Sequence, residues 1–135
     1  MAKKCKDEGA EIVVVHGETL MEPVEEKTNY YASLCEDVDI LAHPGLIDET
    51  TAKNVKENNI FLEITTRKGH GLTNGHVANI ANKFNIPTLI NTDCHSPSDL
   101  INYDFGLKVG LGCNLGMENT LKSLTDYPKE LLKRI

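Results

Sequence analysis

The sequence predicts an α/β fold in which parallel strands alternate with helices. Four short apolar runs have the length and the β-branched composition of buried strands. The segments between them contain helix-capping residues and apolar residues at helical spacing. Strands and helices that alternate in this way form parallel βαβ units, with helices covering both faces of the sheet. The four predicted strands are residues 11–16, 38–42, 60–65 and 87–92.

Helices are predicted before, between and after these strands. Gly9 ends the first one, and Asp48 caps another that runs to about Glu57. Thr73 or Asn74 caps a third, whose apolar residues follow the i, i+3, i+4, i+7 spacing. The remaining helices are expected after Pro23, from Ser96-Pro97, over 115–124 and over 129–135, and a short fifth strand is expected over Leu107–Leu111.

The length of the chain limits the architecture. The 135 residues suffice for a single domain over 1–135, whereas a closed eight-unit barrel takes about 250 residues. The strand pattern suits an open doubly wound sheet or a segment of a barrel. We therefore expect about four to five parallel strands in one of these two arrangements.

Composition bears on partners and location. The chain has 40% hydrophobic and 25% charged residues and a formal net charge of −6, which predicts no electrostatic attraction to nucleic acid or to an anionic membrane. Its four cysteines form no C-x-x-C pair, the N-terminal segment is charged, and no apolar run is long enough to span a bilayer. The expected location is cytoplasmic.

Residues that commonly bind metals follow three of the predicted strands. His16 ends the first strand, His43 follows the second, and Asp93 and His95 follow the fourth. Because the carboxyl ends of parallel strands share one edge of a sheet, these side chains are expected to converge. Three imidazoles and a carboxylate suit a divalent metal ion. A single histidine after a strand is usually an ordinary loop residue, so the prediction depends on the set.

A cationic loop follows the third strand. Arg67, Lys68 and His70 are expected to lie beside the strand-end residues. They could bind a phosphate ester, or they could be a solvated loop. Glu63, within the strand itself, either faces a barrel interior or is simply paired there.

Three motifs carry a resemblance to a known family: Val-His-Gly-Glu at 15–18, Ala-His-Pro-Gly at 42–45 and Asn-Thr-Asp-Cys-His-Ser at 91–96. Together they resemble the later motifs of the PHP (polymerase and histidinol phosphatase) family, in its archaeal histidinol-phosphatase-like form. The resemblance implies a partial TIM-like β/α barrel of the PHP type. It also implies Mn, Fe or Zn ions, up to three in the complete family site and fewer in this chain. It also implies that His16, His43, Asp93 and His95 are metal ligands and catalytic residues, and that the cationic loop holds the substrate phosphate.

The chain departs from the family at its beginning, because no H-x-H motif occurs in it. The resemblance therefore covers only the C-terminal portion of the family pattern. The expected function is a metal-dependent phosphatase acting on a small phosphorylated substrate, with a metal site only partly encoded here. Expected partners are a missing N-terminal half or a second copy paired through open sheet edges. Two alternatives remain. One is an inactive barrel fragment serving as a binding or assembly module. The other is an amidohydrolase-type metal hydrolase, which a bridging lysine would favour, although Lys68, the only loop lysine near this face, lies off a strand end.

Overall fold

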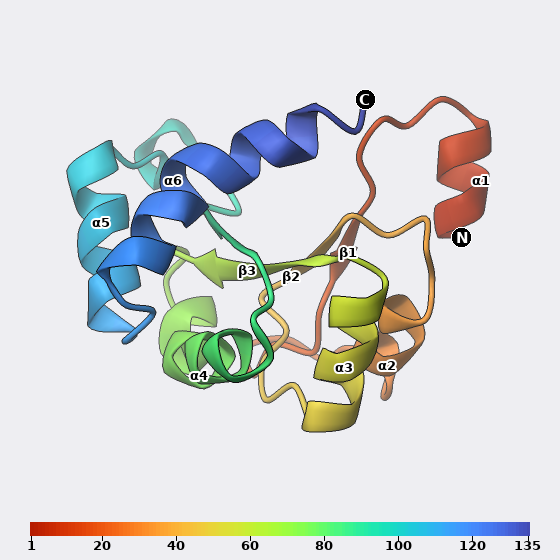
Figure 1. The fold of residues 1–135 in the computed structure, drawn as a ribbon, viewed down its shortest axis with the longest axis horizontal. Coiled ribbons are helices and arrows are strands. Elements are labelled where there is room, and N and C mark those ends of the chain that lie inside the picture. Colours follow the sequence, from red (N-terminus) through yellow and green to blue (C-terminus); the bar gives the residue numbers. More distant parts are fainter.

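A four-stranded parallel sheet forms the centre of the computed structural model, which describes residues 1–135. The strands follow one another across the sheet in chain order, so each βαβ connection joins immediate neighbours (Figure 1). The register places Val14 beside Ile40, Ile40 beside Phe61, and Leu62 beside Thr88. The strands are β1 (Val14–His16), β2 (Ile40–Ala42), β3 (Phe61–Thr65) and β4 (Thr88–Asn91).

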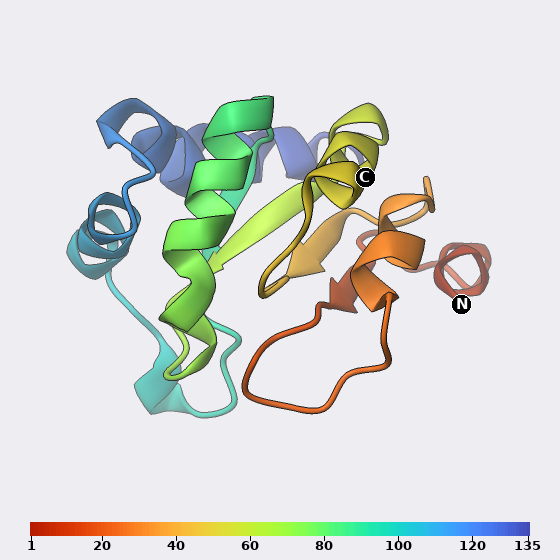
Figure 2. The ribbon, with the colours of Figure 1, turned by 90° about the horizontal axis from the view of Figure 1, so that it is seen from below.

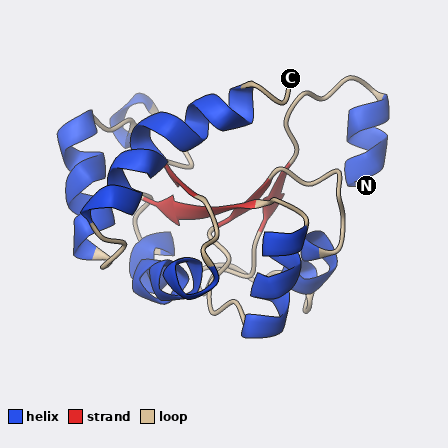
Figure 3. Cartoon of the chain, in the orientation of Figure 1, coloured by secondary structure: helices blue, strands red, loops and turns tan.

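Helices lie on both sides of this sheet (Figure 3). In Figure 1, α2, α3 and α4 lie below the sheet and α6 crosses above it, while α1 lies apart beside the N-terminus. The α-helices are α1 (Ala2–Asp7), α2 (Thr28–Ser33), α3 (Glu49–Glu57), α4 (Asn74–Phe84), α5 (Tyr103–Gly112) and α6 (Met117–Leu132). Two short 3₁₀ helices, η1 (His70–Thr73) and η2 (Pro97–Asp99), follow β3 and β4.

The main core fills the space between the sheet and helices α2 to α4. Seventeen buried residues form it, and Leu41, Leu62 and Ile64 of the sheet are fully buried within it. Val55 of α3 and Val77 of α4 reach it from the helices. The capping carboxylate of Asp48 fixes the start of α3 by accepting hydrogen bonds from the Thr51 backbone N–H and hydroxyl, each at 2.9 Å.

Helix α6 covers part of the second face. Near its first half, the hydroxyls of Ser123 and Thr88 of β4 hydrogen-bond at 2.6 Å. Near its end, Leu131 packs with Ile40, Phe61 and Leu89 in a second, smaller cluster. Just beyond the helix, the Arg134 guanidinium lies over the Phe61 ring and donates to the carbonyl of residue 59 at 2.9 Å. The two faces are therefore covered by different parts of the chain.

The coarse prediction is confirmed: the fold is α/β, with four parallel strands and flanking helices. The sheet is not a closed barrel. The predicted fifth strand over Leu107–Leu111 is wrong, since these residues belong to α5. Asn102 caps that helix by accepting from the Phe105 N–H at 2.9 Å. The two helices predicted after residue 115 form one helix, α6, with Pro128 inside it.

None of the helices is both long enough and apolar enough to cross a membrane. All four cysteines are free thiols, and burial raises the pKa of the Cys113 thiol.

Candidate functional site

The carboxyl ends of the strands bring six ionisable side chains together; His43, Glu63 and His70 are buried, whereas His16 and Glu22 are about half exposed. The long loops after β1 and β4 extend from this end of the sheet (Figure 2). We call these six side chains the strand-end cluster: His16, Glu22, His43, Glu63, His70 and Asp93. Two come from strands and the others from loops or η1.

His43 is the most constrained member of the cluster. It is 4% exposed, and Glu63 beside it is 3% exposed. A single carboxylate oxygen of Glu63, Oε2, accepts from the His43 backbone N–H at 2.8 Å and from its ring Nδ1 at 2.7 Å. Because the carboxylate accepts a hydrogen bond from Nδ1–H, the lone pair of the neutral ring lies on Nε2. That Nε2 is buried and has no hydrogen-bond partner.

His70 repeats this arrangement from the other side. Its Nε2 lies 3.1 Å from Glu22 Oε1, and its Nδ1 is buried without a partner. The second oxygen of Glu22 lies 3.5 Å from His16 Nε2. The three imidazoles stack edge-on, with centroids 4.5 Å apart for His16 and His43 and 4.6 Å apart for His43 and His70. Glu22 thus connects two histidines of the cluster.

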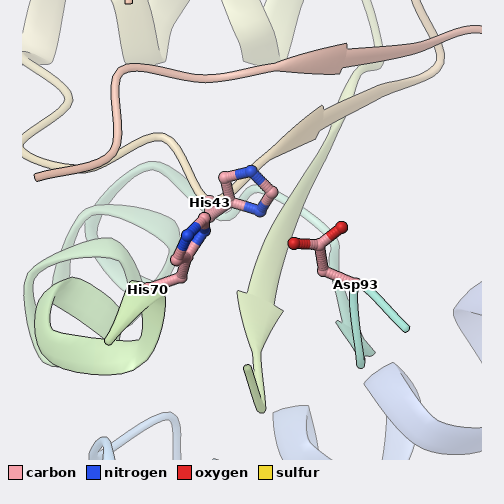
Figure 4. Close-up of side chains that lie close together, drawn as sticks. All are labelled: His43, His70 and Asp93. Atoms are coloured by element: carbon pink, nitrogen blue, oxygen red, sulfur yellow. The ribbon is translucent and has the colours of Figure 1, made fainter. Parts of the chain in front are cut away.

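Asp93 completes the group from the end of β4. One ligand atom each from His43, His70 and Asp93 lies within 4.8 Å of the others, and Figure 4 shows the Asp93 carboxylate turned toward the two imidazoles. Ligands at about 2.1 Å from one ion lie at most about 4.2 Å apart, so a small side-chain shift would bring all three onto one ion. The unpartnered Nε2 of His43 and Nδ1 of His70 are the atoms such an ion would use.

The backbone at two of these residues is unusual. His43 has φ 30° and Asp93 has φ 44°, both in the left-handed region. Residues other than glycine enter that region at a cost of about 1–3 kcal/mol. Gly45, two residues after His43, also has positive φ (62°), and a Cβ there would collide with the carbonyl of Glu18. The chain is therefore held in strained turns where two of the strands end.

Arg67 and His95 lie beside the cluster and contact each other. The Arg67 guanidinium donates to the Asp93 carbonyl at 2.8 Å, lies 3.2 Å from Asp93 Oδ2, and contacts His95 Nδ1 at 2.6 Å. His95 Nδ1 also lies 2.7 Å from the Asp93 carbonyl oxygen, so it faces both a donor and an acceptor, and its tautomer depends on which of the two contacts it makes. The His95 ring is largely exposed, its Nδ1 lies 3.8 Å from Asp93 Oδ1, and it is not one of the three ligand-type residues that lie closest together.

The structure brings some of the predicted site residues together and leaves others apart. His16, His43 and Asp93 converge as the strand-end argument requires, whereas His95 does not join them. Of the cationic loop, His70 enters the cluster, Arg67 is bound to Asp93, and Lys68 is exposed without an ion pair.

Two members of the cluster were not assigned from sequence. Glu22 lies in an irregular loop where no periodicity marks it, and nothing short of the structure identifies it. Glu63 had a usable signal, because a charged residue within an otherwise fully apolar strand needs a buried partner. Glu18, outside the cluster, has a local role: its carboxylate accepts from the backbone N–H groups of Lys27 and Asn29 at 2.9 and 3.0 Å, at the start of α2.

Comparisons with known proteins give a sequence relative and a solved structure of similar fold. No protein-family model matches the chain. Over all 135 residues it is 68% identical to the uncharacterized protein MJ1295 of Methanocaldococcus jannaschii. It superposes, with a TM-score of 0.72 and 21% identity over 99% of its length, on a chain in the cryo-EM structure of an archaeal ribonuclease P with mature tRNA. The chain spans 62% of the first protein and 64% of the second.

These comparisons correct the family assignment. The resemblance to the PHP family is wrong, because no family model supports it and the fold is that of a chain in a ribonuclease P structure. The motifs that carried the resemblance are short, and histidines at strand ends also occur in α/β proteins with other functions.

The prediction of a metal-dependent phosphatase is wrong for the same reason, and so is that of a small phosphorylated substrate. The exclusion of nucleic acid as a partner is also wrong, since the matching fold occurs in an assembly that contains RNA. That exclusion used the net charge of the whole chain, which says nothing about how the charge is distributed.

Proposed function

We propose that this chain is a non-catalytic, RNA-binding protein subunit of an RNA-processing assembly. The observation that carries the proposal is the fold shared along 99% of the chain with a component of an archaeal ribonuclease P structure. In such a role the protein binds and positions RNA, and the strand-end cluster has a structural or ligand-holding function.

The distribution of charge supports an RNA-binding role despite the acidic total. Residues 64–135 carry eight lysines and arginines against six aspartates and glutamates, whereas residues 1–63 carry six against fourteen. RNA affinity depends on local cationic groups that neutralise phosphates, and less on net charge. We therefore assign RNA binding to residues 64–135 and not to the acidic first 63 residues.

Direct binding of RNA tests this proposal. Fluorescence anisotropy with a labelled transfer RNA should give a dissociation constant in the micromolar range, with an affinity that falls as salt rises. Lys108→Glu, on α5, should weaken binding more than Lys53→Glu, which is an equal charge change on α3. Failure to bind at 50 mM salt and 100 μM protein would refute the proposal.

We propose in addition that the strand-end cluster binds one divalent metal ion. His43 Nε2, His70 Nδ1 and one oxygen of Asp93 are the expected ligands, with His16 beside them. The support is the pair of buried ring nitrogens without partners, each on an imidazole whose other nitrogen faces a glutamate. Carboxylates placed in this way fix the tautomer of metal-binding histidines. Zn²⁺, Mn²⁺ and Fe²⁺ all accept imidazole and carboxylate ligands.

Calorimetric titration with Zn²⁺ and Mn²⁺ tests the metal site without any activity assay. His43→Ala should abolish saturable binding, and Glu63→Gln should weaken it about 10–100-fold. His76→Ala is the control, because His76 lies on α4 and its Nε2 contacts the Ile47 carbonyl and no residue of the cluster; it should leave the affinity unchanged. If His76→Ala abolishes binding and His43→Ala does not, the assignment of ligands is wrong.

The finer architecture also belongs to the proposal. We propose that the four strands are a segment of a larger β/α barrel in longer proteins of this type, and that residues 1–135 form one domain. Both matched proteins are about half as long again as this chain, and β1 and β4 are edge strands to which further strands could be added. A cytoplasmic location remains a prediction that agrees with four free thiols.

A further inference from the structure

A pocket of about 750 Å³ opens beside the strand-end cluster. Its walls come from three segments: the loop after β3, the loop after β4 that contains η2, and the first turn of α5. Most of the twelve lining residues are polar, and Leu100, Ile101 and Phe105 supply the apolar part. Among the lining residues, Arg67 and Lys68 are basic and Asp99 is acidic.

Hydrogen bonds hold the loop that forms the far wall. The Asp99 carboxylate accepts from the backbone N–H groups of His95 and Ser96 at 2.9 and 2.8 Å and from the Ser96 hydroxyl at 3.0 Å. The backbone hydrogen bond from His95 does most to lower the pKa of Asp99, so this carboxylate is ionised at neutral pH and already engaged. Asn102 fixes the adjoining start of α5. The shape of the pocket therefore exists before any ligand enters.

The pocket combines two kinds of group that single-stranded nucleic acids require. Phe105 is 49% exposed, so an aromatic ring is available on the pocket wall. Lys68 lines the same pocket without an ion pair, while Arg67 beside it is bound to Asp93. The Thr66 hydroxyl, also in the lining, is buried without a hydrogen-bond partner. Aromatic rings stack on bases and cations attract the phosphate backbone.

We infer that this pocket binds one unpaired nucleotide of RNA, with its base stacked on Phe105 and an adjoining phosphate beside Lys68. The inference rests on the proposed function and specifies it, because it names the form of RNA and the residues that bind it. A base-paired nucleotide has both faces of its base covered by neighbours in the helix, so the pocket selects single strands. Its volume is in the range typical of small-ligand pockets.

The test compares substitutions at Phe105 in an anisotropy titration with a labelled single-stranded RNA and with the duplex of the same sequence. Phe105→Leu keeps an apolar side chain but removes the ring, and it should weaken single-strand binding about fivefold or more. Phe105→Tyr keeps the ring and should restore the affinity. Tyr31→Leu, which removes an exposed ring from α2, is the matched control and should have no effect.

A second substitution tests the phosphate contact. Lys68→Ala should weaken binding and lower the slope of log affinity against log salt by about one. Lys53→Ala, an exposed lysine on α3, should leave that slope unchanged. Ultraviolet cross-linking of RNA that contains 4-thiouridine should label the peptide that includes Phe105.

The outcomes separate the pocket from the proposed function. If the unaltered chain binds RNA and Phe105→Leu binds equally well, the pocket assignment is wrong and RNA binding stands. A preference for the duplex over the single strand would also overturn the pocket assignment. If the unaltered chain binds no RNA, both proposals fail. Circular dichroism of each variant shows whether a loss of binding reflects a loss of fold.

Discussion

The same four strands support two very different environments. Between the sheet and helices α2 to α4 lies a core of seventeen buried residues, almost all aliphatic. At the carboxyl ends of the strands lie three imidazoles, three carboxylates and two residues with left-handed backbone. Three of the four buried side-chain atoms without a hydrogen-bond partner belong to His43, His70 and Thr66, at the strand ends. The core stabilises the fold, whereas the strand ends hold polar groups that a ligand could satisfy.

The largest expected effect comes from the core. Leu62 is fully buried at the centre of the sheet, and Leu62→Ala should lower the free energy of unfolding by about 4 kcal/mol through lost burial and a residual cavity. Leu72→Ala, at a largely exposed leucine, is the control and should cost under about 0.5 kcal/mol. Urea denaturation measures both. If the two variants lost equal free energy of unfolding, the assignment of Leu62 to the buried core would be wrong.

A smaller loss of stability is expected from a substitution at the strand ends that acts through the backbone conformation. Gly45→Ala places a Cβ on a residue with positive φ and against the Glu18 carbonyl, which should cost about 3 kcal/mol. Hydrogen exchange should accelerate first around residues 16–22 and 43–47, while amides in α3 stay protected. Gly112→Ala is the control, because nothing lies within 4 Å of the position that a Cβ would take there; it should stabilise α5 slightly. If amides in α3 lost protection from exchange as much as those at the strand ends, the strand ends and the core would unfold as one unit.

Asp48→Ala removes the cap of α3 and its two hydrogen bonds, and it should therefore lower the free energy of unfolding by about 1 kcal/mol. The backbone hydrogen bond from Thr51 lowers the Asp48 pKa in the folded protein. The stability that the ionised Asp48 carboxylate contributes is therefore fully present above its unfolded pKa of about 3.9. It is lost as pH falls through the lower pKa that Asp48 has in the folded protein. Urea denaturation at pH 7 and pH 3 should show the difference between Asp48→Ala and the unaltered chain shrinking in acid. A difference that grows in acid would reverse the assigned sign.

The smallest effect concerns the fourth buried atom without a hydrogen-bond partner, which lies on α6 and not at the strand ends. The Thr120 hydroxyl is buried without a partner, so Thr120→Val should leave stability unchanged or raise it by about 1 kcal/mol. Thr88→Val is the matched control, because its hydroxyl bonds to Ser123, and it should destabilise the protein by about 1 kcal/mol. Thermal unfolding by calorimetry compares the two. Destabilisation by Thr120→Val would show that its hydroxyl has a partner in solution.

Much of the fold could be predicted because apolar runs and helix caps are local signals. The Asp48 cap lies where expected. The β-branched run before His16 does contain a strand, but only over Val14–His16, and Val14 is 55% exposed, so the prediction that this strand is buried was wrong. The fifth strand was mispredicted because Leu107, Val109 and Leu111 alternate as in a strand. Tertiary packing decides for a helix there: Gly106 and Gly110 let α5 approach α6 closely, with Thr120 against Gly110.

From the sequence, only those site residues could be predicted that directly follow a strand. His16, His43 and Asp93 follow strands, so topology brings them together. Glu22 is placed by an irregular loop, and His95 contacts Arg67 and Asp93 without joining the two buried histidines; neither position has a sequence signal. Function was harder still, since net charge conceals the difference between the acidic first half and the more basic second half.

The late position of Leu131 has a consequence for biosynthesis. Ile40, Phe61 and Leu89 of the sheet are covered by a residue that emerges from the ribosome long after they do. A nascent chain can complete the core beneath α2 to α4 first, while its second sheet face stays open to solvent. During that interval the exposed apolar strands are a target for chaperones or for aggregation. Docking of the last turns of α6 thus removes this apolar sheet face from solvent and ends the interval in which it could drive aggregation.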